Sequence, residues 1–126
     1  MSQVCTTNTK SLLLIAHGSR RASSNMEVQA LTERLAYRVA DRFSHVRCAF
    51  LEFAQPSIPE AIDAAVLMGD SEIVVLPYFL ACGNHVSQDI PEIIAAKRAQ
   101  HASVRIELKP YVGTSPAMLD LLACSV

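Results

Sequence analysis

The stretch SLLLIAH, residues 11–17, decides the fold, because it is apolar without interruption from Leu12 to Ala16 and ends on a histidine. A second continuous apolar run, EIVVLPYFL, occupies residues 72–80. Such runs are typical of strands that are covered on both faces. Of two further runs, HVRCAFLEF (45–53) begins by alternating, with Val46, Cys48 and Phe50 on one face, and SVRIELK (103–109) alternates apolar and polar residues, as edge strands tend to do. We therefore expect four strands, with the first and third in the centre of a sheet.

A helical pattern follows each of these runs and begins with a recognisable start signal. In a capping box, a serine hydroxyl accepts a hydrogen bond from an unpaired backbone N–H group, and a glutamate three residues later reaches back. Proline is tolerated in the first turn, and Gly69 has the position of a helix end. The expected starts are Ser24 with Glu27, Ser57 with Glu60, Asp89 with Glu92 around Pro91, and Ser115 with Pro116.

The order β-α-β-α-β-α-β-α, with short connections, predicts a parallel sheet flanked by helices. With the first and third strands in the centre, the simplest strand order is 2-1-3-4, a flavodoxin-like open α/β sheet. The fourth helical pattern runs to the C-terminus through Met118, Leu119 and Leu122. We expect one domain over residues 11–126, preceded by a flexible N-terminal tail at residues 1–10.

Composition excludes several classes of protein. The net charge of −1 gives no basic field for nucleic acid, and no apolar run approaches the roughly 20 residues that cross a bilayer. The N-terminus has no signal-peptide pattern. The four cysteines (Cys5, Cys48, Cys82 and Cys124) form no C-x-x-C pair, so we expect reduced thiols in a cytoplasmic protein.

In open parallel sheets, ligands bind beyond the carboxyl ends of the strands, where the strand order reverses. Here that point lies between the first and third strands. His17 ends the first strand, Glu52 lies at the end of the second, and His85 follows the third in a glycine-containing loop. The other two histidines, His45 and His101, fall at the opposite edge. This partition predicts a site formed by two imidazoles and a carboxylate.

The side chains around this predicted site have more than one interpretation. Arg20 and Arg21 are either ordinary loop charges or contacts for an anionic ligand beside the first helix, whose free N–H groups favour anions. Asp89 is interpreted as a helix cap rather than a ligand. Cys82 near His85 could form a thiol nucleophile, but no third orienting residue is evident.

Three segments together resemble a known family. They are HGS (17–19), LEFAQPSIPEAI (51–62) and LPYFLACGNHVSQDIP (76–91), the last containing the pattern P-x-F-x-x-x-G-x-H-x-x-x-D-x-P from Pro77 to Pro91. They resemble the CbiX/SirB-type sirohydrochlorin chelatases, which are class II tetrapyrrole chelatases. The resemblance extends from about residue 11 to the end, and the chain length matches the short form of the family.

The resemblance implies a chelatase-like domain that inserts a divalent metal into sirohydrochlorin in the biosynthesis of cobalamin or sirohaem. Co²⁺ is the expected metal, with Ni²⁺ and Fe²⁺ as further candidates. The family's metal-handling histidines fall on His17 and His85 and its glutamate on Glu52, which makes these three the expected catalytic residues. No cofactor is expected beyond the substrate metal. Two identical chains are expected to pair and form the cleft.

The expected substrate-binding residues are Ser19, Arg20, Arg21, Tyr78 and Gly83. The arginines would pair with carboxylates of the tetrapyrrole, and Tyr78 would supply part of an aromatic wall. For Tyr78, packing in the core is the competing interpretation.

Two other functions compete with chelation. AHGSRR (16–21) faintly resembles the R-H-G motif of histidine phosphatases, but Ala16 stands where that motif has arginine. A non-catalytic module that binds a metal or a tetrapyrrole is the second alternative.

Overall fold

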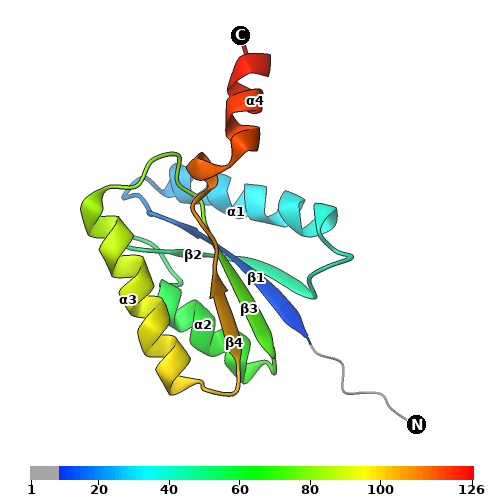
Figure 1. Cartoon of the computed structure of the whole chain (residues 1–126), viewed down its shortest axis with the longest axis vertical. Coiled ribbons are helices and arrows are strands. Elements are labelled where there is room, and N and C mark those ends of the chain that lie inside the picture. Colours follow the sequence, from blue (N-terminus) through cyan, green and yellow to red (C-terminus); the bar gives the residue numbers. More distant parts are fainter. Residues whose placement is uncertain (1–8) are drawn as a thin grey trace.

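The computed structural model describes residues 9–126, the side chain of His85 excepted, and it alternates strands and helices along the chain (Figure 1). Residues 1–8 of the expected tail lie outside the described residues. The elements are β1 (Lys10–Ala16), α1 (Ala22–Arg38), β2 (His45–Phe50), α2 (Ile58–Leu67), β3 (Glu72–Pro77), α3 (Asn84–Gln100), β4 (Arg105–Leu108), the 3₁₀ turn η2 (Val112–Thr114) and α4 (Pro116–Cys124).

The sheet has the predicted order β2-β1-β3-β4, and all its neighbouring strands are parallel. The prediction that the first and third strands are central is therefore confirmed. Every residue of β1 from Ser11 to Ala16 is buried, because both neighbours and both faces cover this strand. Since parallel strands all end at one edge, the segments that follow β1, β2 and β3 are brought to the same end of the sheet.

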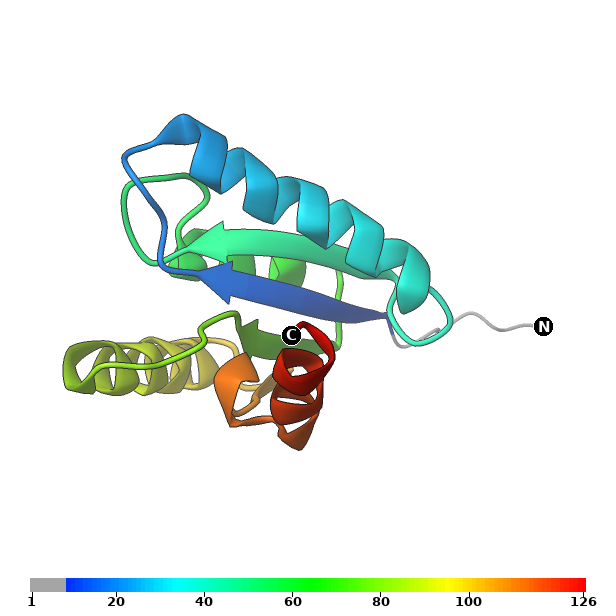
Figure 2. The same ribbon diagram turned by 90° about the horizontal axis from the view of Figure 1, so that it is seen from above.

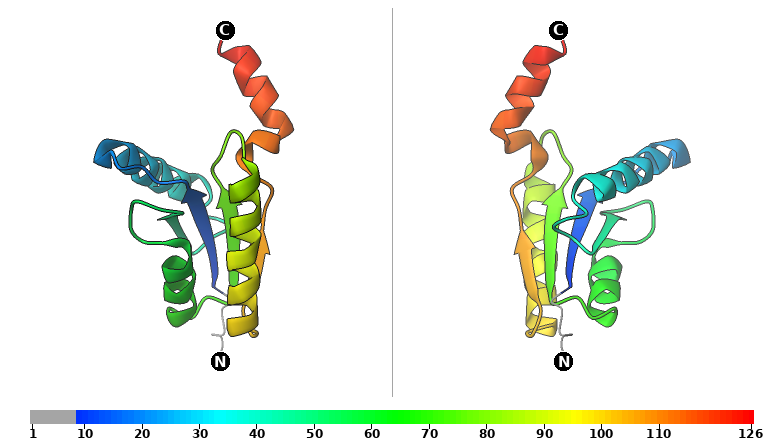
Figure 3. Two further views of the ribbon diagram at one scale, coloured as in Figure 1. Left: turned by 90° about the vertical axis from the view of Figure 1, so that its left-hand side faces the viewer. Right: turned by 90° about the vertical axis from the view of Figure 1, so that its right-hand side faces the viewer.

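The two faces of the sheet are covered differently. Helices α2 and α3 lie on one face and α1 on the other (Figures 2 and 3). The larger core lies under α2 and α3, and the smaller one lies under α1. The larger core contains Leu13, Ile15, Ala49, Ile58, Ala61, Ile62, Ala65, Ile73, Val75, Ile90, Ile94 and Ile106. The smaller core contains Leu12, Val39 and Val74, with Leu35, Phe43, Val46 and Leu76 packed against them.

Two of the four predicted helix starts are confirmed. Ser57 and Glu60 form the full capping box: the Ser57 hydroxyl accepts from the Glu60 N–H at 3.3 Å, and the Glu60 carboxylate accepts from the Ser57 N–H at 2.9 Å. The Ser115 hydroxyl accepts from the Ala117 N–H at the start of α4. Gly69 follows the end of α2 with φ +95°, a conformation that favours glycine.

The predicted start at Ser24 is wrong. Helix α1 begins at Ala22 with Arg21 as its N-cap, and Ser24 lies inside the first turn. Two side chains outside the predicted box close the preceding turn instead. The Asn25 side chain accepts from the Ser19 N–H at 2.9 Å and donates to the Ser19 carbonyl at 2.8 Å, while the Ser19 hydroxyl accepts from the Arg21 N–H.

The predicted start at Asp89 is also wrong, since α3 begins at Asn84 and contains Pro91 in its interior. Proline costs a helix one hydrogen bond and favours the first turn, which is why the sequence suggested a later start. Burial of Ile90 and Ile94 against the sheet holds these turns in helical form despite the proline.

Within residues 9–126, no helix is long and apolar enough to cross a membrane. Cys48, Cys82 and Cys124 are free thiols, and Cys5 lies outside the described residues. Burial raises the pKa of the Cys48 thiol above its ordinary value, so this side chain stays protonated at neutral pH.

Candidate functional site

The candidate site lies at the end of the sheet where β1, β2 and β3 finish and their following loops gather (Figure 2). His17 directly follows β1, and Glu52 lies two residues after β2. Their side chains meet: His17 Nε2 lies 2.7 Å from Glu52 Oε2. The two side chains are 48% and 50% exposed, so the pair is formed and yet open to a ligand.

Backbone hydrogen bonding also joins the two residues of this pair. The Glu52 N–H donates to the His17 carbonyl at 3.0 Å, which extends the β1–β2 pairing past the ends of both strands. Between them, Gly18 has φ +93°, and a Cβ atom at this position would lie 1.8 Å from the Glu52 carbonyl oxygen. Only glycine therefore fits between His17 and the loop that carries Glu52.

The arginines predicted to bind substrate lie beside the pair. The Arg20 guanidinium lies 4.9 Å from the centre of the Phe53 ring, a cation–π distance. Phe53 has φ +68°, which is unusual for a residue other than glycine and is a form of strain found at ligand sites. Arg21 is the N-cap of α1, and Ser19 closes the turn before it.

The third strand brings Tyr78, Gly83 and His85 to the same edge. The Tyr78 N–H donates to the Ile15 carbonyl at 2.7 Å, and its exposed side chain borders a hollow of about 460 Å³ against α1. Gly83 is the N-cap of α3, and His85 is the second residue of that helix. Asp89 lies one helical turn after His85, inside α3, so it is not the helix cap that the sequence predicted.

The opposite edge of the sheet holds the other two histidines, as the sequence predicted. His45 is the first residue of β2, next to Ser11 at the start of β1. His101 follows α3, and its Nε2 lies 2.9 Å from the Asp63 carboxylate, which also accepts from Lys97 at 2.8 Å. Hydrogen bonds from Lys97 and then from His101 hold the pKa of Asp63 below its ordinary value.

Among the described side chains, no group of three His, Cys, Asp or Glu is gathered to hold a metal ion. At this edge, the described side chains of His17 and Glu52 form a histidine–carboxylate pair. When Nε2–H donates to the carboxylate, the Nδ1 lone pair of a neutral imidazole is left to bind a metal ion or accept a proton. The arrangement can thus bind a cation or move a proton at an open site.

Sequence reasoning did not identify Phe53 or Asn25 as contributors to this edge. Phe53 stands in the segment LEFAQPSIPEAI, but nothing in its composition signals a positive φ. Asn25 lies six residues after Ser19, and asparagine just inside a helix start was the available signal for a side chain that closes the turn.

Fold and site together define a class of protein: an open parallel α/β domain with an imidazole–carboxylate pair at the carboxyl ends of its strands. The family is identified by comparison with known proteins. The family model described as CbiX matches residues 11–126, and the chain therefore belongs to the CbiX family.

The chain is similar to curated proteins named sirohydrochlorin cobaltochelatase. It is 36% identical to that of Methanocaldococcus jannaschii over 94 residues, which are 73% of this chain and 63% of the relative. It is 33% identical to that of Methanosarcina barkeri, over 88% of this chain and 85% of the relative. The match spans about three fifths of the first curated relatives, since it covers 63%, 58% and 58% of three of them.

Solved structures share the fold. A CbiX protein of cobalamin (vitamin B12) biosynthesis from Marinobacter aquaeolei VT8 has a TM-score of 0.71 and 29% identity, over 92% of this chain and 96% of that chain. The sirohydrochlorin chelatase SirB from Bacillus subtilis subspecies spizizenii, in complex with cobalt, has a TM-score of 0.78 and 27% identity, over 92% of this chain and 49% of that chain.

Proposed function

We propose that this chain inserts a divalent metal ion into sirohydrochlorin, with cobalt as the first candidate metal. The observation that carries the proposal is the 2.7 Å contact between His17 and Glu52 at the carboxyl ends of the strands, in a chain of the CbiX family. Relatives named sirohydrochlorin cobaltochelatase and sirohydrochlorin ferrochelatase support the substrate. Their names differ in the metal.

The reaction needs an open, basic site. A divalent ion must shed bound water, and two pyrrole N–H protons must leave as the metal–nitrogen bonds form. Neutral imidazole suits Co²⁺, Ni²⁺ and Fe²⁺ as a ligand and is largely unprotonated at neutral pH. We assign His17 to the metal or to the pyrrole protons, with Glu52 fixing its tautomer and accepting charge. His85 is proposed as the second metal-handling residue, since the backbone of α3 starts at the same edge.

The remaining predicted residues are proposed to bind the tetrapyrrole. Arg20 and Arg21 lie at the start of α1, where a carboxylate would meet both positive side chains and free backbone N–H groups. Ser19 and Gly83 shape the turns on either side of the opening, and the half-exposed Tyr78 ring offers an aromatic surface.

A single sheet edge is shallow, whereas binding sites usually cover most of a ligand. We propose that a second identical chain supplies the opposite wall, as a two-fold homodimer. We also propose that the protein works in the cytoplasm, where its free thiols would remain reduced.

The test is a spectral assay of sirohydrochlorin with Co²⁺, Ni²⁺ or Fe²⁺, run on the wild type and on His17→Ala, His85→Ala and Glu52→Ala. Metal insertion changes the absorption of the macrocycle, so rates are read directly against the uncatalysed reaction. We expect acceleration by the wild type and its loss in the variants, with circular dichroism showing that they remain folded. Unimpaired insertion in both histidine variants would refute the assignment, and metal binding without acceleration would identify a binding module instead.

A further inference from the structure

Phe53 is an aromatic residue in an unusual position at the carboxyl edge of the sheet. It directly follows Glu52 in the loop after β2, its side chain is 51% exposed, and it belongs to neither core. Its φ of +68° is rare for a bulky residue, and such a conformation persists only where the surroundings hold it. Packing in the core therefore does not explain why this side chain is held here.

The loop that carries Phe53 is attached to the fold at both ends. At its start, the Glu52 N–H donates to the His17 carbonyl at 3.0 Å, and near its end the Pro56 carbonyl accepts from the Phe50 N–H at 2.9 Å. The formed capping box then begins α2 directly after the loop. The backbone around Phe53 is thus held next to the histidine–carboxylate pair, and it sets the place from which the ring projects.

The ring of Phe53 contacts the Arg20 guanidinium, whose central carbon lies 4.9 Å from the ring centre. Arg20 is exposed, and none of the ion pairs among the described side chains includes it. A cation–π contact pairs the charge with a ring and gives the N–H donors of the guanidinium no oxygen acceptor. Arg20 therefore keeps the capacity to bind a carboxylate through two parallel hydrogen bonds.

A second cation–π contact, at the opposite edge of the sheet, has a different setting. Lys10 Nζ lies 5.2 Å from the centre of the Phe43 ring, and the same ammonium lies 3.7 Å from the Glu72 carboxylate. There the charge already has an anionic partner within the fold. At the carboxyl edge, Arg20 has a ring but no acid among the described side chains, which leaves it available for a carboxylate of a ligand.

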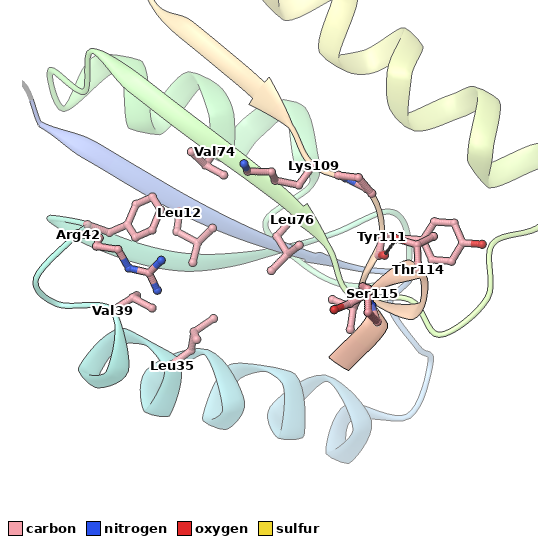
Figure 4. Close-up of a pocket in the computed structure, with 14 residues that line it drawn as sticks. Leu12, Leu35, Val39, Arg42, Val74, Leu76, Lys109, Tyr111, Thr114 and Ser115 are labelled. Carbon is pink, nitrogen blue, oxygen red and sulfur yellow. Dashed lines mark hydrogen bonds between the residues drawn. The ribbon is translucent and has the colours of Figure 1, made fainter. Parts of the chain in front are cut away.

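The apolar hollow on the α1 face of the sheet is not the place for this ligand group. It measures about 600 Å³, and in Figure 4 Leu12 and Leu76 on the strands and Leu35 on α1 point into it. Neither Arg20 nor Phe53 lines it. An anion bound by Arg20 therefore lies at the carboxyl edge, beside the histidine–carboxylate pair.

We propose that Phe53 is a positioning residue: its ring holds the Arg20 guanidinium beside the histidine–carboxylate pair, ready to bind one carboxylate of the tetrapyrrole. This role rests on the proposed function, in which Arg20 binds sirohydrochlorin. Arg20 lies in the loop that follows His17. Phe53 directly follows Glu52, so the contact joins the two loops that carry the pair. A guanidinium held in advance loses less side-chain freedom when the carboxylate binds, so the contact strengthens binding rather than the chemical step.

Titration of metal-free sirohydrochlorin, followed by its fluorescence, tests this role in binding. We expect Phe53→Leu to weaken binding about threefold, because an exposed cation–π contact is lost, and Phe53→Tyr to bind like the wild type. Arg20→Gln should weaken binding about tenfold, and Arg20→Gln/Phe53→Leu no further, since Phe53 acts through Arg20. Lys10→Gln removes the cation of the other contact and should bind normally. Wild-type affinity in Phe53→Leu, or effects that multiply to about thirtyfold in the double variant, would overturn the proposal.

Two further measurements separate this role from metal insertion. In the insertion assay, Phe53→Leu should raise the KM for sirohydrochlorin and leave kcat within about twofold of the wild type. Without any ligand, NMR should show the Cδ protons of Arg20 shifted upfield by the ring in the wild type and in Phe53→Tyr, and at ordinary positions in Phe53→Leu. Ordinary positions in the wild type would overturn the proposal, whether or not every variant folds.

The outcomes also distinguish this proposal from the proposed function. A wild type that binds sirohydrochlorin without inserting metal would refute the proposed function, and the binding comparison would still decide the role of Phe53. A wild type that inserts metal while Phe53→Leu binds as tightly would overturn the role of Phe53 alone. No binding of sirohydrochlorin by the wild type would overturn both.

Discussion

Among the described side chains, two histidine–carboxylate pairs lie at opposite edges of the sheet, and they have similar contact distances but different surroundings. His17 and Glu52 lie 2.7 Å apart at the carboxyl edge, and His101 and Asp63 lie 2.9 Å apart at the opposite edge. A contact distance therefore does not identify a functional pair. The two pairs are distinguished by their exposure and by the residues around them.

The pair at the carboxyl edge is held by loops under backbone constraint, and both of its side chains are about half exposed. The other pair joins α2 to the end of α3, where Lys97 is only 12% exposed and neutralises the same carboxylate. The Asp63 carboxylate therefore already has two hydrogen-bonding partners, Lys97 and His101, whereas the exposed His17–Glu52 pair is open to a ligand. The first arrangement suits binding and proton transfer, and the second suits the packing of two helices.

The largest expected difference between the two pairs is in activity. We expect His17→Ala to slow metal insertion at least 100-fold, in the range typical for loss of a residue that transfers protons, and to leave thermal stability nearly unchanged. His101→Ala is the matched control, with near-normal insertion and a lower melting temperature. Equal insertion rates in the two variants would remove the functional distinction between the edges.

The next largest effect concerns how the His17 pair is held. In Gly18→Ala, the new Cβ atom collides with the Glu52 carbonyl at a positive φ, so we expect a loss of about 3 kcal/mol in the free energy of unfolding. Gly69→Ala has nearly the same φ, +95°, with nothing within 4 Å, so the conformational cost alone should be about 1 kcal/mol. Urea unfolding measures both. Equal losses would mean that the loop moves aside and that the close approach is unimportant.

Much of the contrast between the two edges was predictable from the sequence, because the end of the strand beside which a histidine stands determines the edge at which it lies. Continuous apolar runs identified the central strands, and from that order the four histidines divided correctly between two edges. The contact between His17 and Glu52 was expected only as proximity. Its formation depends on Gly18 and on the positive φ of Phe53, which are properties of the backbone rather than of residue type.

Helix starts were less predictable, because tertiary contacts override local signals. Ser24 and Asp89 have the composition of caps, yet the Asn25–Ser19 bonds and the burial of Ile90 moved both starts earlier in the chain. The sequence also did not predict that α4 would be exposed, because its leucines have the spacing of a helix that packs against a core.

A smaller change in stability is expected at the start of α2, the helix that connects the two edges. Ser57→Ala removes half of a formed capping box just after the loop that carries Glu52, so we expect a loss of about 1 kcal/mol in unfolding free energy. Ser24→Ala should change it by a few tenths at most, since Ser24 caps nothing. Chemical denaturation of both variants at pH 7 compares them. A larger effect at Ser24 would restore the cap that the sequence predicted.

The smallest expected effect is a pH dependence confined to the opposite edge. Because the pKa of Asp63 is lower in the folded protein than in the unfolded chain, its pair stabilises the fold above the unfolded value of about 3.9 and loses this effect as pH falls through the folded value. The carboxylate is 45% exposed, so we expect Asp63→Asn to reduce stability by less than about 1 kcal/mol at pH 7. The difference from wild type should disappear near the acid end of a series of thermal melts. A difference of constant size down to low pH would mean that the substitution disturbs packing between α2 and α3 rather than the charge of Asp63.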